Sequence, residues 1–512
     1  MLSILLEKKE HMKLEIFKHL LNSIHPRSTK ELSSFFKITS ATLTRYINEL
    51  SLELSDFPAE NVQLIERPKG HYAIINNLSI NSISIFEELR LSYFEKLIEF
   101  QLISLLLEKR FFSFTNLASK LLISESYLYK VIKKIQPILL TFKLELNLEN
   151  DGPYNFNGKV LNLRFFAYTF TWFSYKNIKW PPAFKEISKM NLENSMRLVY
   201  KEEKPSITIP SSNRFYFILT IIMKYPSSSL DLDTTLKEFV EPLTVANYLP
   251  SSFLSCFFSD SFKHINNSSL SEETVFLNYA LHLLVPDIYS EKDKEAIGLA
   301  CKNSNIYKEF SLPFLQSIAD YFSLTLSHSH LNTLLYYTNL YALFLYIDID
   351  IIDLFRPHPT IPLYGYPDKE PNPISFEIGT YWAQFSKSSH LLLEVSNSHK
   401  NVMYDFIYFI ITTLSRPKLV IFINYSTSFH GTEFLTTEIV NFFGTDIITI
   451  ASEPDQADVI ISDTHEVYLT EGQELFFTKI ITGPDSWEKL LTYLHNKMFN
   501  LKFRYIEHKP TK

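Results

Sequence analysis

The sequence predicts a mainly α-helical multidomain protein with two N-terminal winged helix-turn-helix units, two helical bundles and a small C-terminal α/β domain. Three observations predict this class. A helix-turn-helix pattern occurs twice near the N-terminus, 85 positions apart. Helix-spaced Leu, Phe and Tyr fill the middle of the chain, and strands alternate with helices after about residue 415. At 512 residues the chain is also too long for a single core.

The composition limits the classes of protein to which the chain can belong. Apolar residues make up 46% and aromatic residues 15%, which is enough for packed cores and excludes a disordered chain. Glycine contributes only 10 residues, and neither glycine-rich phosphate-binding motif is present. The only cysteines, Cys256 and Cys301, exclude a disulfide framework and a thiolate zinc site. We therefore expect no cofactor and no metal.

The sequence also predicts the localisation of the protein and shows how its charge is distributed. No run approaches 18 apolar residues, and residues 1–6 lack the basic start and cleavage site of a signal peptide, so we expect a cytoplasmic protein that does not interact with membranes. The net charge is −7, but residues 1–150 carry 19 Lys or Arg against 17 Asp or Glu. This distribution permits local basic patches in the N-terminal part of an otherwise acidic protein.

The repeated pattern starts with a short helix that carries a leucine followed by a small residue, which allows a second helix to cross closely. A turn with a buried isoleucine follows, then a Thr or Ser cap, and then a helix with apolar residues at i, i+4 and i+7. Two such patterns in register favour DNA binding. The matched positions are Leu32, Ser33, Phe36, Ile38, Thr39, Leu43, Ile47 and Leu50 in the first copy, and Leu117, Ala118, Leu121, Ile123, Ser124, Leu128, Ile132 and Ile135 in the second.

The first unit is placed at residues 1–80, with a leading helix at Ser28–Phe36 and a recognition helix at Thr39–Leu50. Two strands, Val62–Glu66 and His71–Ile75, are predicted to form a wing. The N-terminal half of a recognition helix enters the major groove, and cations at a wing tip can contact phosphates. The candidate DNA-binding residues here are Ser40, Thr44 and Arg45 on the helix, beside Ala41, and Arg67 and Lys69 at the wing tip.

The second unit is placed at residues 81–160, with the helix pair in Phe114–Leu140 and Ser124 as the helix cap. Leu144–Leu148 and Tyr154–Phe156 resemble a second wing. If Leu128, Ile132 and Ile135 face the core, three lysines and a tyrosine remain outside, a stronger electrostatic footprint than that of the first unit. The outward residues are Glu125, Ser126, Tyr129, Lys130, Lys133 and Lys134, of which all but Glu125 are candidate DNA-binding residues.

Two alternatives to this interpretation stay open. Both units could be amphipathic helix pairs whose lysines cover a solvated face. Alternatively, the second unit alone could bind DNA while the first is a scaffold. The in-register repeat, the helix caps and the predicted wings favour DNA binding over the first alternative.

The middle of the chain is divided into helical bundles at residues 165–285 and 286–395. A histidine on an apolar helix is usually a satisfied core or surface residue, and this interpretation is favoured for His264, His282, His328, His330 and His390. Acidic residues are scattered and form no constellation that would mark a catalytic pocket. We therefore expect no enzyme activity from this region.

The C-terminal domain is placed at residues 410–505 and is expected to form a small parallel sheet. Its loop 425–431 contains Ser426, Ser428 and His430, but neither a third catalytic residue nor an oxyanion-hole motif accompanies them. A helix-capping loop is therefore favoured over an active site. The predicted strands are Pro417–Asn424, Asp446–Ala451 and Ala457–Ser462, and the predicted helices are Thr432–Phe443 and Trp487–Met498.

The order of these parts, with Thr39-Ser-Ala-Thr-Leu-Thr-Arg-Tyr-Ile47 and its repeat at Ser124–Ile132, resembles the Mga/AtxA/RofA group. These are stand-alone virulence regulators of Gram-positive bacteria. The resemblance implies bundles like the regulation domains (PRDs) of the sugar phosphotransferase system (PTS). It also implies an EIIB-like last domain that supports dimerisation. An EIIB domain carries a phosphorylated cysteine after its first strand, whereas this chain has Tyr425-Ser-Thr-Ser428, so phosphotransfer there is not expected.

In such regulators, phosphorylation of bundle histidines by the PTS phosphocarrier protein can tune activity. The candidate phosphorylation sites here are His264, His282, His328 and His330. The sequence therefore predicts a homodimeric transcriptional regulator that binds double-stranded promoter DNA and activates virulence or surface-protein genes, under PTS-linked control. One alternative is a PTS-linked sensor that acts through protein or RNA partners without binding DNA. The other is an enzyme that uses loop 425–431.

Overall fold

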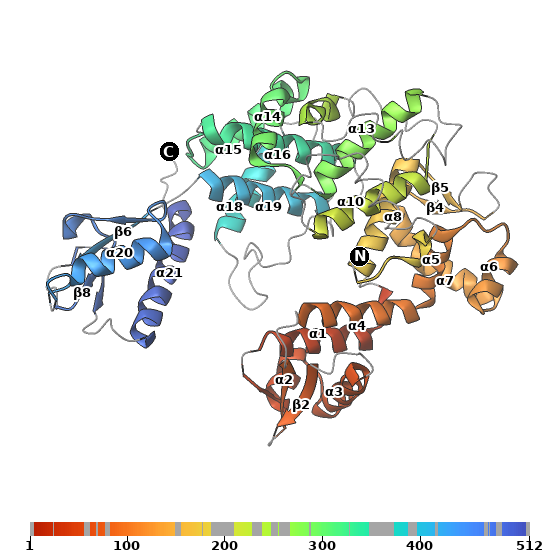
Figure 1. Ribbon diagram of the computed structural model, residues 1–512, viewed down its shortest axis with the longest axis horizontal. Helices are drawn as coiled ribbons and strands as arrows, with labels where there is room; N and C mark the ends of the chain where they lie inside the picture. The colour runs from red at the N-terminus through yellow and green to blue at the C-terminus, as the bar shows by residue number, and fades with distance from the viewer. Residues whose placement is uncertain are drawn as a thin grey trace. The chain divides into compact units, whose positions relative to one another are not determined.

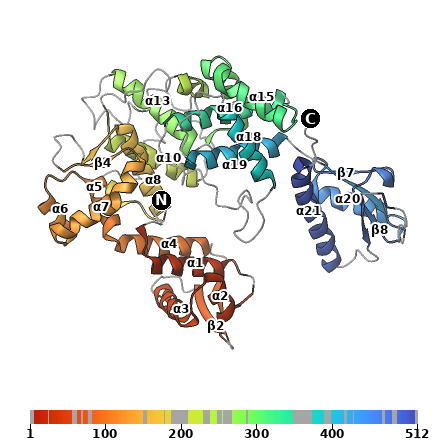
Figure 2. The ribbon, with the colours of Figure 1, turned by 180° about the vertical axis from the view of Figure 1, so that it is seen from behind.

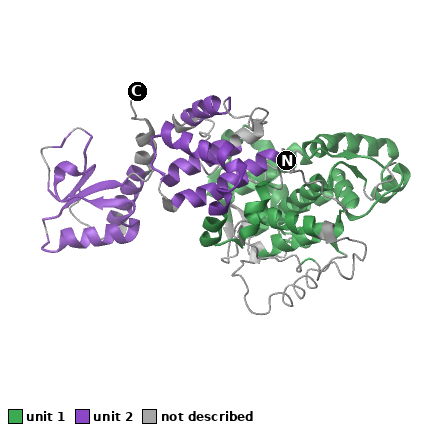
Figure 3. Ribbon diagram, turned by 90° about the horizontal axis from the view of Figure 1, so that it is seen from above, with its two compact units in different colours: residues 1–297, 347–354 green, residues 298–346, 355–512 purple. Residues whose placement is uncertain are grey.

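The chain forms two compact units, residues 1–297 with 347–354 and residues 298–346 with 355–512 (Figure 3). The first unit contains both predicted helix-turn-helix units, and the second contains the C-terminal α/β domain. The computed structural model describes residues 5–23, 25–55, 62–67, 70–76, 82–148, 155–176, 178–185, 209–227, 238–246, 254, 267–285, 288–326, 328–347, 373–387, 397–414, 418–426, 428–464, 469–470, 472–477 and 484–507.

The first helix-turn-helix unit is a small helical domain with a three-stranded antiparallel sheet in the order β1-β3-β2 (Figure 1). Leu32, Leu43, Ile47 and Leu50 are at most 2% exposed and form one core with residues of the first and fourth helices. The predicted helices and wing strands of this unit are therefore confirmed. The elements are α1 (Lys8–Leu21), β1 (Arg27–Ser28), α2 (Thr29–Phe36), α3 (Ser40–Ser55), β2 (Val62–Arg67) and β3 (His71–Asn76).

Local capping explains where these helices begin and end. Ser28 and Glu31 form a capping box at the start of α2, in which each side chain accepts a hydrogen bond from the other residue's backbone amide. Lys37 ends α2 in the left-handed conformation at φ 53°. The amide of Thr42 donates to the Thr39 hydroxyl, so Thr39 caps α3. The turn between the two helices is thus set by side chains next to it.

The second helix-turn-helix unit repeats this design. Ser113 and Ser124 each accept a hydrogen bond from the amide three residues later, at the starts of α6 and α7. Leu122 occupies the left-handed turn position at φ 58°, and its side chain is 92% exposed. The elements are α4 (Ser82–Lys96), α5 (Ile98–Glu108), α6 (Phe114–Leu121), α7 (Glu125–Thr141), β4 (Glu145–Leu146), β5 (Phe156–Asn157) and α8 (Val160–Tyr175).

The predicted register of α7 needs one correction. Leu128 and Ile135 are fully buried as expected, but Val131 is 2% exposed whereas Ile132 is only partly buried. The inward stripe therefore runs 128, 131, 135, 138, which follows the i, i+3, i+7 spacing of a helix. The second wing is confirmed as the antiparallel pair β4–β5, and residues 149–154 lie outside the described part.

Helix α8 connects the second helix-turn-helix unit with the helices that follow it in the first unit. Thirteen of its residues are buried, and it packs against α10. The fully buried Arg164 guanidinium pairs with the carboxylate of Glu273 at 2.6 Å and also donates to the carbonyl of Tyr225. This ion pair joins α8 to α13. The further elements here are η2 (Pro182–Phe184), α10 (Ile209–Lys224), η3 (Glu241–Ala246) and α13 (Asn267–Leu284).

The helical part of the second unit has an aromatic core. Phe314 packs on Phe406, which in turn stacks on Tyr341 at a centroid distance of 3.9 Å. Helix α19 lies beyond residue 395, where the second predicted bundle ends, and packs on α18. The elements are α14 (Glu291–Cys301), which contains the division between the units, η5 (Tyr307–Ser311), α15 (Leu312–Tyr321), α16 (His328–Ile347), α18 (Pro373–Phe385) and α19 (Asn397–Leu414).

The C-terminal domain contains a parallel four-stranded sheet in the order β7-β6-β8-β9 (Figure 2). Leu435 and Ile439 of one helix and Leu490 and Leu494 of the other share a core with the strands. The parallel sheet is confirmed, but the prediction missed strand β9. The elements are β6 (Leu419–Asn424), α20 (Gly431–Phe443), β7 (Ile448–Ile450), η7 (Pro454–Gln456), β8 (Val459–Ser462), β9 (Glu474–Phe477) and α21 (Pro484–Glu507).

Candidate nucleic-acid interface

The outer face of α7 is the best candidate surface for nucleic acid. Leu128, Val131 and Ile135 turn inward, and the residues opposite them are exposed. At about 100° per residue, Ser126, Lys130 and Lys133 fall on the side opposite this stripe. The structure therefore brings these three together on one face, as the sequence predicted, beside Tyr129, which is 56% exposed.

Two contacts between α6 and α7 hold side chains of this outer face in place. The ring of Tyr129 stacks on Phe114, with ring centroids 4.7 Å apart. The hydroxyl of Thr115 donates to the carboxylate of Glu125 at 2.5 Å. Both contacts tie the recognition helix to the leading helix at its N-terminal end, the end that approaches base edges in helix-turn-helix proteins.

Lys134 differs from the other two lysines of α7. Its Nζ lies 2.6 Å from Oε1 of Glu99, a residue of α5 that is largely buried. This pair lies on the flank of α7 that faces α5, and it partly neutralises the lysine. Lys134 is therefore less suited to hold a phosphate than Lys130 or Lys133. The sequence offered no signal for this pairing, because the two residues are 35 positions apart.

The first unit presents a weaker surface. Ser40 and Arg45 are exposed on α3, whereas Thr44 is partly buried, and the Arg45 guanidinium lies 5.3 Å from the ring of Tyr46. Arg67 ends β2, but its side chain and all of Lys69 lie outside the described residues. The two predicted wing-tip contacts therefore stay predictions.

The balance of charged residues also makes the second helix-turn-helix unit the better candidate for binding DNA. From the cap of the leading helix to the end of the wing, residues 28–76 contain five Lys or Arg and six Asp or Glu. The matching stretch of the second unit, residues 113–157, contains five Lys or Arg and four Asp or Glu. Sequence reasoning also missed Lys120, an exposed cation on α6. The signal was available, since the leading helix crosses the DNA backbone in this type of domain.

The candidate phosphorylation sites differ in accessibility. His282 is 1% exposed, stacks on Tyr289 and lies with Nε2 3.1 Å from the carbonyl oxygen of Leu243. Burial lowers the pKa of His282 to about 3, so the ring is neutral and enclosed. His330 on α16 is partly buried. The side chain of His328 and all of His264 lie outside the described residues.

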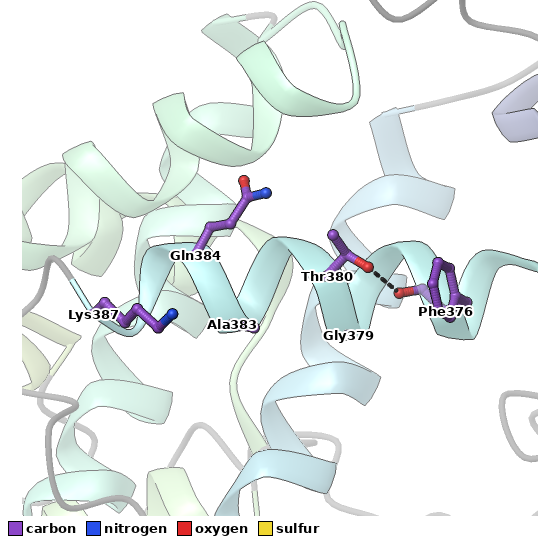
Figure 4. A pocket seen from close by; sticks show the side chains of 6 residues that line it. All are labelled: Phe376, Gly379, Thr380, Ala383, Gln384 and Lys387. Carbon is purple, nitrogen blue, oxygen red and sulfur yellow. Dashed lines mark hydrogen bonds between the residues drawn. The ribbon is translucent and has the colours of Figure 1, made fainter.

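In the loop after β6, the hydroxyl of Ser426 is bonded to a residue other than His430. The Ser426 hydroxyl donates to Asp463 at 3.0 Å, not to His430, which is exposed. A surface hollow lies along one face of α18, where the hydroxyl of Thr380 is used in a hydrogen bond to the carbonyl of Phe376 (Figure 4). The side chains that line it include no histidine, cysteine or carboxylate: Phe376, Gly379, Thr380, Ala383, Gln384 and Lys387.

Among the residues that the structure describes, no group of three or more His, Cys, Asp or Glu could hold a metal ion. None of the helices in that part of the chain is long and apolar enough to span a membrane.

Comparison with known families supports the interpretation of the second unit. Residues 83–170 match the Mga helix-turn-helix domain. The match extends from α4 into α8 and contains the α6–α7 pair and the β4–β5 wing. This part of the chain is therefore a helix-turn-helix domain similar to that of Mga-like regulators. Comparison with curated proteins finds no match.

Proposed function

We propose that this protein is a DNA-binding transcriptional regulator and that α7 of the second helix-turn-helix unit enters the major groove. One observation carries the proposal: the domain that matches the Mga helix-turn-helix family exposes Lys130 and Lys133 on its recognition helix, opposite the buried stripe. In this arrangement the lysines neutralise phosphates, while Ser126 and Tyr129 approach base edges or the backbone.

The first test measures binding of the full-length protein to a fluorescent promoter-length duplex across a salt titration. In the double variant Lys130→Ala/Lys133→Ala, affinity should fall for every duplex. The slope of log K against log salt should flatten by about 2, since each lost phosphate contact removes roughly 0.9 to 1.

Two single variants serve as controls. Lys489→Ala removes an exposed lysine of α21 in the C-terminal domain and should leave the salt slope unchanged. Lys134→Ala should change the slope less than Lys133→Ala, because Lys134 is paired with Glu99. Salt-dependent binding that is equal in wild type and the double variant would move the interface away from α7. No salt-dependent binding by the wild type would contradict the proposed function itself.

The proposal includes an oligomeric state and regulation. A single winged domain with so few cations would bind weakly at physiological salt, so we propose a homodimer that places two domains on one duplex. Sedimentation of the protein with and without duplex tests this. We further propose a cytoplasmic activator of virulence or surface-protein genes, controlled by the PTS phosphocarrier protein through histidines of the helical region. Enclosure of His282 makes His264, His328 and His330 the sites to test first by phosphopeptide mapping.

A further inference from the structure

Glu125 is an acidic residue at the end of α7 that would approach DNA. It is the first residue of the helix, it is exposed, and it is the only Asp or Glu in the α7 sequence. A glutamate in the first helical turn interacts favourably with the positive end of the helix dipole, which explains its presence in part. The cap itself is provided by Ser124, whose hydroxyl accepts from the amide of Tyr127. An interaction with the helix dipole requires no partner from another helix, yet Glu125 has such a partner on α6.

Thr115 of α6 holds the carboxylate of Glu125 through a 2.5 Å hydrogen bond to Oε1. The leading helix thereby fixes where this charge lies at the N-terminal end of the recognition helix. Four residues along, the same helix pair fixes Tyr129 by stacking on Phe114. A carboxylate has about four acceptor positions, so this hydrogen bond leaves capacity for another donor. The side chain is thus ordered before any ligand arrives, which reduces the entropy lost on binding.

A fixed carboxylate in the major groove is repelled by phosphates and finds few compensating donors. The donors that base edges present there are the amino groups of cytosine N4 and adenine N6, and Glu pairs with cytosine N4. A DNA sequence without such an amino group at this position desolvates the carboxylate and adds no donor to the one that Thr115 provides, which penalises binding.

We propose that Glu125 is a specificity-determining residue that accepts a hydrogen bond from the amino group of a cytosine in the major groove. The inference rests on the proposed DNA binding through α7. It assigns opposite effects to the two kinds of charge on this helix. Lys130 and Lys133 raise affinity for all DNA, whereas Glu125 lowers affinity for most sequences and spares those with cytosine at one position.

The test compares wild type with Glu125→Gln, both full length. The wild-type protein selects duplexes from a randomised library, and the dissociation constants of the selected and of a random duplex are then measured. In Glu125→Gln the random duplex should bind more tightly, and the ratio of the two constants should fall by about tenfold. Library selection with the variant should lose the cytosine preference at one position and retain the others.

Glu488→Gln is the matched control. Glu488 is an exposed glutamate of α21 in the C-terminal domain, so the substitution removes the same charge outside the helix-turn-helix domain. It should leave the base preference and the ratio unchanged. An unchanged ratio in Glu125→Gln, or an equal gain for both duplexes, would overturn the inference while leaving DNA binding in place. A wild-type selection without any preferred base would do the same. Absence of salt-dependent binding by the wild type would overturn the proposed function as well.

Discussion

The buried side chain of His282 is held by two specific partners, a backbone carbonyl and an aromatic ring. The Nε2 atom of His282 lies 3.1 Å from the carbonyl oxygen of Leu243, so Nε2 carries the proton and donates it. Tyr289 covers the ring at a centroid distance of 3.7 Å, and the side chain is 1% exposed. A proton on Nδ1 would place a charge in this enclosed site. Burial therefore lowers the pKa of His282 to about 3.

This shift predicts acid sensitivity with a definite sign. The unfolded chain binds a proton at His282 below about pH 6.5, whereas the folded protein stays neutral there until about pH 3. The stability that His282 contributes is therefore present above pH 6.5 and is lost as the pH falls toward 3. Between pH 6.5 and 3, protonation of His282 in the unfolded chain lowers the free energy of unfolding by an amount that approaches about 1.4 kcal/mol per pH unit. His282→Phe, which keeps the ring stack, should flatten the slope of unfolding free energy between pH 6.5 and 5, measured by urea titration.

A matched variant separates this effect from a general loss of histidine. His495 is exposed on α21, so His495→Phe should leave the pH slope between 6.5 and 5 as in wild type. An equally steep slope in His282→Phe and wild type would contradict the prediction.

Individual side-chain roles were harder to predict than their positions. Ser126, Lys130 and Lys133 are exposed as the helical spacing predicted. The pairing of Lys134 with Glu99 and the tether of Glu125 to Thr115 were not predicted. Spacing along one helix fixes which side of that helix a residue occupies, but the partner comes from another helix whose rotation the sequence does not reveal.

At the scale of elements, helix ends were predictable where a side chain defines them. Thr39 and Ser124 cap helices at the predicted positions, whereas Ser28, predicted as the first residue of the leading helix, is its cap. Strand β9 was missed because its four residues, Glu474–Phe477, show no alternation and contain an apolar run of only three residues. Its pairing with β8 provides the backbone hydrogen bonds that make it a strand, and such a long-range contact leaves no local signal.

The crossing of α14 and α16 gives a prediction at this scale. A Cβ added at Gly298 would lie 1.8 Å from the carbonyl oxygen of Asn332, an impossible contact. Gly298→Ala must therefore separate the two helix backbones and should destabilise the second unit by about 2 kcal/mol or more. Thermal unfolding measures this loss.

Gly379→Ala is the control for the same chemical change. A Cβ at Gly379 on α18 would meet only the hydroxyl of Tyr404, at 3.7 Å, which is an ordinary contact. Alanine is also the better helix former by about 0.5 to 1 kcal/mol, so this variant should be neutral or stabilising. Equal midpoints for the two variants would show that the α14–α16 crossing tolerates a methyl group.

At the scale of the whole molecule, the order of parts was readable because the periodicity of apolar residues changes along the chain. The division into two compact units between residues 297 and 298 could not be predicted from this periodicity, because it falls within α14. Contacts such as Arg164–Glu273, 109 residues apart, decide which helices belong together. Similar apolar helices flank α14 on both sides, so composition could not locate the boundary.

Two units with separate cores should unfold in two calorimetric transitions, and DNA should discriminate between them. A ligand that binds one folded unit stabilises that unit by mass action, about 2.7 kcal/mol when its free concentration is a hundred times Kd. Because α7 belongs to the first unit, a duplex should raise one midpoint only, and this shift should disappear in Lys130→Ala/Lys133→Ala. Gly298→Ala should lower the other midpoint, since Gly298 and Asn332 both belong to the second unit. A duplex that raised both midpoints equally, or a single transition in every variant, would show that the units fold as one and that DNA binding is coupled to the entire chain.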